Sequence, residues 1–129
     1  MRLLLDTHTL FWAILDEALL SPHARSALRS LQNESYVSVA SVWEMAIKVG
    51  LGKWPEAAEL VDNIEHEIVA TGFRFLPISS QHARAAGLMQ ADHRDPFDRL
   101  LVAQAISEPL RLLTCDAQLA AYSELVTVL

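Results

Sequence analysis

The chain has 129 residues, of which 52% are hydrophobic, and its formal net charge is -6, with 16 acidic residues against 10 Lys and Arg residues. This length suits one domain, residues 1–129, built around one hydrophobic core, and leaves no room for a second domain. The negative charge argues against binding a polyanion through bulk electrostatics, so a nucleic-acid partner would require a local basic patch or a bridging cation.

The sequence also indicates where the protein works. No apolar run reaches the roughly 18 residues that a membrane span requires, and the amino-terminal segment MRLLLDTH is charged where a signal peptide would still be apolar. Cys115 is the only cysteine, so an internal disulfide is excluded. We therefore expect a cytoplasmic protein with no membrane segment. Its large hydrophobic fraction suggests that a partner or a second copy covers part of its surface.

Short runs typical of β-strands alternate with amphipathic helical segments along the chain. Strands are expected at 2–5, 35–39, 73–78, 111–114 and 125–129. Helices are expected at 10–15, after Ser21-Pro22, from Ser41 to about 50, over 56–70, from 79 or 80 to 89, and after Asp95-Pro96. This alternation predicts an α/β fold with a central, mainly parallel sheet of about five strands, covered on both faces.

Five acidic residues are expected to meet at one edge of this sheet. Asp6 directly follows the first strand, and Glu44 lies in the first turn of the helix after the second strand. Asp95 and Asp98 begin the last long helix, and Asp116 comes two residues after the fourth strand. Ligands bind open parallel sheets at the carboxyl ends of the strands, so these acids map to the expected crevice.

Ordinary structural roles also account for several of these acids. Ser41 and Glu44 fit a capping box, and Asp95 before Pro96 fits a helix N-cap. Turns accept aspartate at the positions of the remaining acids but do not require it. Carboxylates gathered within several ångströms repel one another unless a cation is present, so the joint pattern favours a metal site.

Oxygen ligands without a cysteine or histidine cage select a hard ion, Mg²⁺ or Mn²⁺, over zinc. His8 and His93 lie near Asp6 and Asp95 in the sequence, which leaves a zinc or general-base role open for them. A histidine at a sheet edge is more commonly a surface group. An ion held by carboxylates can activate water and stabilise charge on phosphorus, so phosphodiester hydrolysis is the reaction that this arrangement suits.

Four ordered motifs carry a family resemblance: LLLDTHTLFW, SVASVWEMAIKVGLGK, HRDPFDRLLVAQA and LLTCD. Together they resemble PIN-domain ribonucleases, in particular the toxin half of VapBC-type toxin–antitoxin pairs, over essentially the whole chain. The resemblance implies a three-layer α/β/α domain with an acidic pocket that binds Mg²⁺ or Mn²⁺ and cleaves RNA.

The family's pocket residues carry over one by one. Asp6 matches the first-strand aspartate, Glu44 the helix glutamate, Asp98 the aspartate that opens the LLVAQA helix, and Asp116 the aspartate of the T-x-D motif. Asp95 belongs to a DPFD variant of the third motif, and it is open whether Asp95 is a fifth metal ligand or only the N-cap. Thr7 and Thr114 are candidates for hydrogen bonds to the pocket carboxylates, although both are also ordinary residues at strand ends.

The resemblance also implies partners: a cognate VapB-type antitoxin, whose basic side chain can enter the acidic pocket, and a second copy of the chain in a homodimer. The helix after Asp6 and the segment 41–70 are candidates for the antitoxin groove.

Several residues near the motifs have competing interpretations. Arg99 is expected to face the pocket rim or pair with an acid, with a phosphate contact as the alternative. Trp12 and Trp43 are expected to be core or interface anchors, although they and Trp54 could stack on bases. Cys115 is expected to be a small buried residue.

Three other functional classes are weighed against a nuclease. A haloacid-dehalogenase phosphotransferase requires Asp-x-Asp-x-Thr, and the segment from Asp6 to Thr9 lacks the second aspartate. A receiver domain would have its acceptor aspartate after the third strand, where FRFLPISS has none. The main rival is a PIN-like module that binds RNA or protein without cutting. Such modules commonly lose pocket acids, and the retention of all four here favours catalysis.

Overall fold

The computed structural model describes residues 1–90 and 95–128, so the interpretation of His93 lies outside the described residues. The strands are β1 (Arg2–Leu5), β2 (Glu34–Ser38), β3 (Arg74–Leu76), β4 (Arg111–Thr114) and β5 (Val126–Val128). The α-helices are α1 (Thr7–Leu15), α2 (Pro22–Arg29), α3 (Val39–Gly50), α4 (Ala58–Asp62), α5 (Ile64–Thr71), α6 (Ser80–Leu88) and α7 (Pro96–Ser107). The 3₁₀ segments are η1 (Glu17–Leu19), η2 (Pro55–Ala57) and η3 (Ala117–Tyr122).

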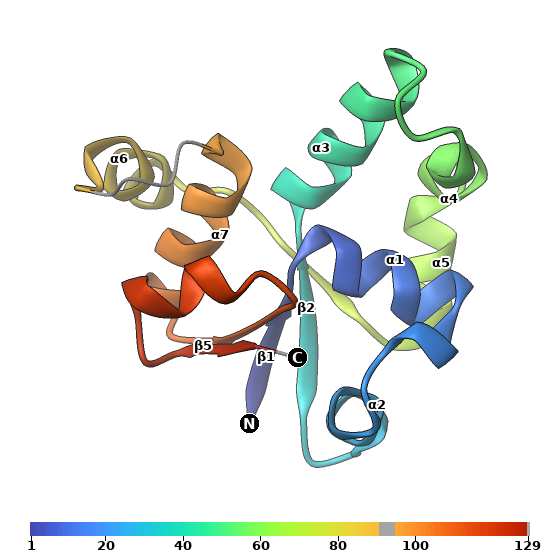
Figure 1. Ribbon diagram of the computed structural model, residues 1–129, viewed down its shortest axis with the longest axis horizontal. Helices are drawn as coiled ribbons and strands as arrows, with labels where there is room; N and C mark the ends of the chain where they lie inside the picture. The colour runs from blue at the N-terminus through green and yellow to red at the C-terminus, as the bar shows by residue number, and fades with distance from the viewer. Residues whose placement is uncertain (91–94, 129) are drawn as a thin grey trace.

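The five strands form one sheet in the order β3-β2-β1-β4-β5, and every neighbouring pair is parallel. The chain builds outward from β1 through β2 to β3, then returns to β4 and β5 on the other side of β1 (Figure 1). The direction of winding therefore reverses between β1 and β4. In open α/β sheets the ligand crevice forms at such a reversal, outside the carboxyl ends of the two strands.

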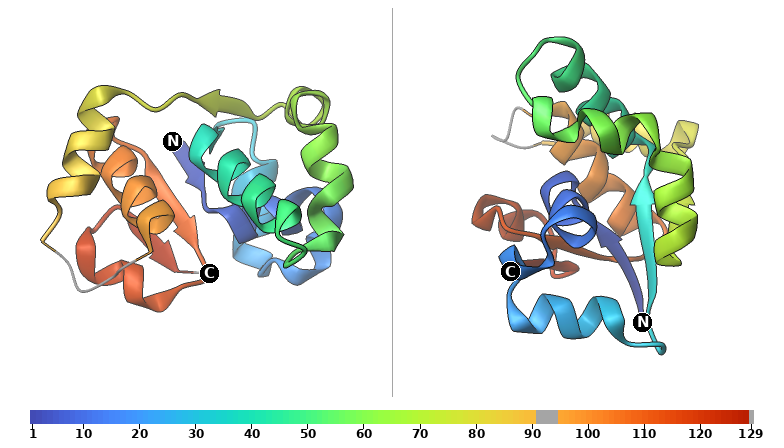
Figure 2. Two further views of the ribbon diagram at one scale, coloured as in Figure 1. Left: turned by 90° about the horizontal axis from the view of Figure 1, so that it is seen from above. Right: turned by 90° about the vertical axis from the view of Figure 1, so that its right-hand side faces the viewer.

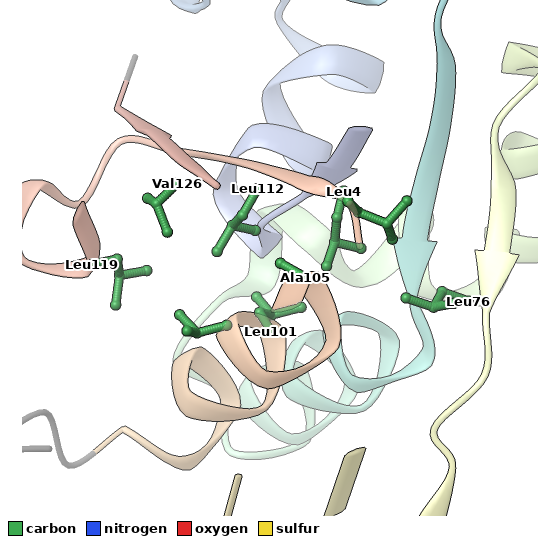
Figure 3. Packing of buried hydrophobic residues seen from close by; sticks show 9 residues of the cluster. Leu4, Leu76, Leu101, Ala105, Leu112, Leu119 and Val126 are labelled. Carbon is green, nitrogen blue, oxygen red and sulfur yellow. The ribbon is translucent and has the colours of Figure 1, made fainter. Parts of the chain in front are cut away.

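Helices cover both faces of the sheet, which makes the predicted three-layer α/β/α architecture correct (Figure 2). Adjacent residues of β1 serve opposite faces because side chains alternate along a strand. Leu5 belongs to the hydrophobic cluster beneath α1, α3, α4 and α5. Other members of this cluster are Leu10, Met45, Leu60, Ile64 and Ile68. Leu4 belongs to the cluster under α7 and η3, with Leu101, Ala105, Leu112, Leu119 and Val126 (Figure 3).

Two helix boundaries differ from the sequence prediction, and the difference changes the reading of Glu44. The N-cap of α3 is Ser38, whose Oγ accepts a hydrogen bond from the Ala40 amide at 3.0 Å, so the helix begins at Val39 and not at Ser41. The predicted capping box of Ser41 and Glu44 is therefore wrong. Glu44 lies in the second turn of α3, where capping does not explain it. Similarly, α1 begins at Thr7, three residues earlier than predicted, because Asp6 caps it.

The predicted helix over 56–70 is broken into η2, α4 and α5. Asn63 separates the two α-helices with φ -119° and ψ 22°, and its side chain donates to the Glu59 carbonyl at 3.0 Å. Asparagine competes in this way with the helical hydrogen-bond pattern. The apolar period was still informative, since Leu60, Ile64 and Ile68 are all buried. Among the described residues, no helix is long and apolar enough to cross a membrane.

Candidate active site

A cavity of ≈ 410 Å³ lies at the carboxyl edge of the sheet, and all five acids singled out from the sequence line it. Its lining residues are Asp6, Thr7, His8, Glu44, Lys48, Asp95, Asp98, Cys115 and Asp116. They come from the segments that follow β1 and β4, from the starts of α1 and α7, and from the second and third turns of α3. Segments far apart in the sequence thus meet at one place because parallel strands end at the same edge (Figure 1).

Asp6 is held at the floor of this cavity and is only 6% exposed. Its Oδ1 accepts a hydrogen bond from the Thr9 amide at 2.9 Å, which caps α1, and its Oδ2 accepts one from the Thr114 hydroxyl at 2.6 Å. The Asp6 amide donates to the Leu113 carbonyl at 3.0 Å, continuing the pairing between β1 and β4. These contacts fix the orientation of the carboxylate. The predicted hydrogen bond from Thr114 to a pocket acid is present.

Glu44 is the second buried carboxylate, at 5% exposure, and it has two partners in the cavity wall. The Thr7 hydroxyl donates to Glu44 Oε1, which is the other predicted threonine contact, and Thr7 Oγ1 lies 3.0 Å from Ser41 Oγ. Lys48, one turn further along α3, places Nζ 2.8 Å from Glu44 Oε2. Reasoning from the sequence missed Lys48. Its spacing of four residues from Glu44 on a predicted helix was the available signal.

Asp95 is the N-cap of α7, and a metal-ligand role for it stays a prediction. Its Oδ1 accepts hydrogen bonds from the Phe97 amide at 2.9 Å and the Asp98 amide at 3.3 Å. The cap fixes the first turn of α7 and with it the position of Asp98, which lines the cavity. Asp95 lines it too, so the cap role does not remove Asp95 as a ligand candidate.

A buried hydrogen bond sets α7 against the start of α3. The Ser38 hydroxyl, which caps α3, donates to Gln104 Oε1 on α7 at 2.6 Å, and both side chains are fully buried. Gln104 Nε2 donates to the Pro77 carbonyl at 3.3 Å, just after β3. The helices that carry Glu44 and Asp98 are therefore joined through the interior of the protein.

Asp116 completes the set of acids, at the start of η3. Its Oδ1 accepts a hydrogen bond from the Gln118 amide at 2.9 Å, and its own amide donates to Thr114 Oγ1 at 3.0 Å. Thr114 thus connects the turn that carries Asp116 to the carboxylate of Asp6, since its hydroxyl donates to the latter.

Cys115 lines the cavity and is exposed, so the prediction of a buried cysteine was wrong. It follows the last residue of β4, where the chain turns away from the sheet. Partial burial raises the pKa of the Cys115 thiol, and the charges of Asp6, Asp116 and Asp98 raise it further. Asp6, Asp98 and Asp116 thus all lie close enough to Cys115 to raise the pKa of its thiol.

Arg99 does not act as predicted. Its guanidinium donates to backbone carbonyls at the carboxyl end of α6: Ala86 at 3.0 Å, Gly87 at 3.4 Å and Met89 at 2.7 Å. These contacts cap the last carbonyls of α6 in place of the predicted rim position or acid pair, and the phosphate contact stays a prediction. The sequence could not indicate this role because it depends on the packing of α6 against α7.

The three tryptophans occupy different positions around the site. Trp43 is 59% exposed and meets Phe97 edge to face at 5.3 Å, so it is not a core residue. Trp12 and Trp54 are half-buried, and both contact the His8 ring, at 5.9 Å and 5.0 Å between ring centroids.

The donor set of the cavity fits a hard divalent cation. All five acids supply carboxylate oxygens, and Mg²⁺ and Mn²⁺ prefer such ligands. Two of the acids are nearly fully buried, where uncompensated negative charge is costly. Within residues 1–90 and 95–128, no three His, Cys, Asp or Glu side chains are drawn together as tightly as bound metal would hold them. The chemistry of the residues therefore fits the ion, and the carboxylates would need to close around it.

The fold and this acidic edge define a class of protein that comparison with known sequences identifies. The sequence model of the PIN domain matches residues 3–125, and the chain belongs to the PIN domain family. No curated protein matches the sequence closely enough to count as a relative.

Solved structures share the fold across the whole chain. VapBC2 from Rickettsia felis, solved bound to a DNA fragment from its promoter, has a chain that matches with a TM-score of 0.70 and 17% identity, covering 100% of this chain and 98% of its own. FitAcB from Neisseria gonorrhoeae matches at 0.68 with 20% identity, covering 98% and 96%. VapC20 from Mycobacterium tuberculosis, described as a sarcin-ricin loop cleaving toxin, matches at 0.61 with 18% identity, covering 92% and 93%.

Proposed function

We propose that this protein is a metal-dependent endoribonuclease of the VapC type, which hydrolyses RNA phosphodiester bonds as the toxin of a toxin–antitoxin pair. One observation carries the proposal: the five acids predicted from separate motifs line a single cavity at the reversal point of a PIN-domain sheet. Family membership and structural neighbours that include a ribosomal-loop cleaving toxin support the same activity. An RNA substrate inside the cell implies action in the cytoplasm.

In the proposed mechanism, Asp6, Glu44, Asp98 and Asp116 would hold Mg²⁺, with Mn²⁺ as a substitute, and Asp95 is a candidate fifth ligand. The bound cation would supply Lewis-acid activation of water and neutralise charge on the phosphate. The Thr9 and Thr114 contacts hold the Asp6 carboxylate in one orientation before substrate arrives. One of the four carboxylates accepts the proton of the attacking water, which requires an acid within hydrogen-bond reach of that water.

Lys48 has a positioning role in this proposal. It compensates the buried charge of Glu44 while the cavity lacks another cation, and it lies at the cavity wall where a phosphate would approach. A cation bound among the acids would compete with Lys48 for Glu44, leaving the ammonium group available to the negatively charged substrate.

We also propose a VapB-type antitoxin and a second copy of the chain as partners. The outer side of α3 supports the need for partners because it carries an exposed apolar row at four-residue spacing: Val39, Trp43, Ile47 and Leu51. An acidic cavity beside such a surface suits a segment that combines apolar and basic side chains. Coexpression with the neighbouring reading frame should improve solubility and abolish RNA cleavage. A stable, soluble and fully active monomer that is indifferent to that protein would contradict the partner proposal.

The test of the enzymatic proposal is cleavage of a mixed RNA pool by the purified protein in Mg²⁺, in Mn²⁺ and in EDTA. The parent should cut in both metals and not in EDTA, and Asp98→Asn should lose cleavage. Asp62→Asn is the matched control because Asp62 is an exposed acid on α4, outside the cavity. Binding of RNA without cleavage in any metal would instead identify a non-catalytic PIN-like module.

A further inference from the structure

A stacked pair of rings forms part of the cavity wall beside the acids. His8 is exposed and lines the cavity, and its ring lies 5.0 Å from the Trp54 ring with only 25° between the planes. The two residues are distant in sequence, one on the first turn of α1 and the other just before η2. Their near-parallel arrangement is therefore a product of the fold.

The stack has a rigid base. Trp54 is half-buried, contacts Phe11 at 4.8 Å, and packs with Phe11 against the core cluster beneath α1, α3, α4 and α5. The order Phe11, Trp54, His8 thus runs from the core toward the cavity. Trp12 supports His8 from the side, with ring centroids 5.9 Å apart and planes tilted by 56°. His8 is therefore the last ring in this series of contacts, and it is exposed to solvent.

The surroundings of His8 select a planar and polar ligand. Asp6, Glu44 and Lys48 line the same cavity, so a purely aliphatic side chain there would be placed among charged groups. A nucleobase presents a π-face to the histidine ring and polar edges to these neighbours and to water. Lys48 lies on the same side of the site, with Nζ 5.8 Å from the centroid of the Trp54 ring, and supplies positive charge for a phosphate.

We propose that His8, backed by Trp54, is the stacking site for an unpaired base next to the scissile phosphate of the RNA. This inference rests on the proposed function and adds to it a residue that positions the substrate. A base within a duplex cannot reach the His8 ring without leaving its own stack. His8 acts here through its ring face, as a residue that positions substrate.

The experiment measures equilibrium binding of short single-stranded RNAs that each carry fluorescent 2-aminopurine at one position. Ca²⁺ replaces Mg²⁺ as the oxygen-seeking cation, and gel analysis verifies that the RNA stays intact. The variants are His8→Ala, which removes the ring, and His8→Phe, which keeps a ring but no nitrogen. His66→Ala, an exposed histidine on α5 outside the cavity, is the control. Cleavage kinetics in Mg²⁺ are measured in parallel.

The proposal expects 2-aminopurine quenching at one position next to the cleavage site with the parent protein. His8→Ala should lose this quenching and weaken binding roughly five- to hundredfold, as expected for one lost base–aromatic stack, with a higher KM and a nearly unchanged kcat. His8→Phe should restore both signals, and His66→Ala should match the parent.

Three results would overturn the stacking proposal, and a fourth would refute the proposed function. Parent-like binding by His8→Ala, with cleavage intact, would refute the stacking site while leaving the nuclease assignment in place. An equal loss of activity in His8→Phe and His8→Ala would assign His8 to imidazole chemistry instead of stacking. Weaker binding of an arginine-containing peptide by His8→Ala, together with parent-like RNA binding, would assign the stack to a protein partner. A parent that neither binds nor cuts RNA would refute the proposed function itself.

Discussion

The two edges of the sheet differ in how their charged side chains are paired. At the amino edge, β1, β3 and β4 each begin with an arginine, and at the carboxyl edge five acids line one cavity. Arg2 donates to the Glu108 carbonyl at 3.3 Å and lies 5.3 Å from the centroid of the Tyr36 ring. Arg111 donates to the Glu124 carbonyl at 3.3 Å and to Thr127 Oγ1 at 2.9 Å.

The comparison distinguishes charged side chains that stabilise the fold from charged side chains that destabilise it. Arg2 and Arg111 bind carbonyls, a hydroxyl and an aromatic face, all neutral groups that hold neighbouring elements together. At the carboxyl edge, like charges crowd together, and two of them are buried. Buried negative charges near one another cost folding free energy unless a cation binds. A site that destabilises the apo protein is expected where function requires a bound cation.

The largest effect should follow from removing one carboxyl-edge charge with Asp6→Asn. Asparagine retains the helix-capping geometry, so the fold should persist, and loss of a metal ligand should reduce cleavage about a thousandfold or more. The melting temperature without metal should stay equal or rise, because a buried negative charge is gone. Single-turnover cleavage and thermal unfolding in EDTA measure the two effects. Cleavage at the parent rate in matched metal would break the assignment of the site.

Removal of the metal from the parent protein should change both its cleavage activity and its melting temperature. Cleavage should be lost in EDTA, and added Mg²⁺ should raise the melting temperature of the parent by favouring the folded state that binds it. The melting temperature of Asp6→Asn should rise less on addition of Mg²⁺, or not at all. An equal increase in both proteins would place the binding of Mg²⁺ elsewhere.

Lys48→Met tests the one cation that pairs with a buried acid of the site in the described part of the chain. Methionine keeps an unbranched apolar stem beside Trp54 but leaves Glu44 without its ion pair. In EDTA the variant should lose about 1 kcal/mol of unfolding free energy, since the partly exposed lysine limits the strength of the pair. Added Mg²⁺ should reduce the difference in unfolding free energy between Lys48→Met and the parent. Cleavage should fall about tenfold to a hundredfold, because loss of a group that pairs with a metal ligand typically reduces activity by that much.

At the amino edge, Arg111→Met should show the opposite pattern. Loss of its hydrogen bonds to the Glu124 carbonyl and Thr127 should cost about 1 kcal/mol of unfolding free energy with cleavage unchanged. Denaturant unfolding and cleavage kinetics check both parts. A large loss of cleavage with intact stability would mean that this edge also contacts RNA, and the comparison of the two edges would fail.

The smallest effect concerns Cys115, whose thiol pKa is raised by the negative charges at the carboxyl edge of the sheet. Because its thiol pKa is raised by partial burial and by nearby carboxylates, the folded protein holds the thiol proton to higher pH than the unfolded chain does. Alkylation of the folded protein should therefore be slower than that of the denatured protein at the same pH, and its pH profile should lie above the ordinary thiol value. Asp6→Asn should move the profile to lower pH by removing the largest of the charge effects. An unmoved profile would contradict the convergence of these charges on Cys115.

Much of the fold and the site followed from local patterns in the sequence. The strand at 2–5 and the strand at 111–114 have the bounds predicted, and Ser21 and Asp95 cap the helices expected after them. Cap residues and short apolar runs act through neighbouring backbone groups, so a local pattern is sufficient to place them. The rule that parallel strands present their carboxyl ends at one edge then placed five acids together.

What the sequence determined by itself was the alternation of strands and helices, the identity of the five acids and the edge of the sheet to which they belong. The Ser38 cap of α3 and the pair of Lys48 with Glu44 are also local contacts, which the sequence prediction missed. Only the tertiary structure decided that Arg99 caps α6 and that His8 stacks on Trp54. The first set depends on interactions within one turn or one strand. The second depends on how helices pack across the sheet, and that packing arises from the whole core.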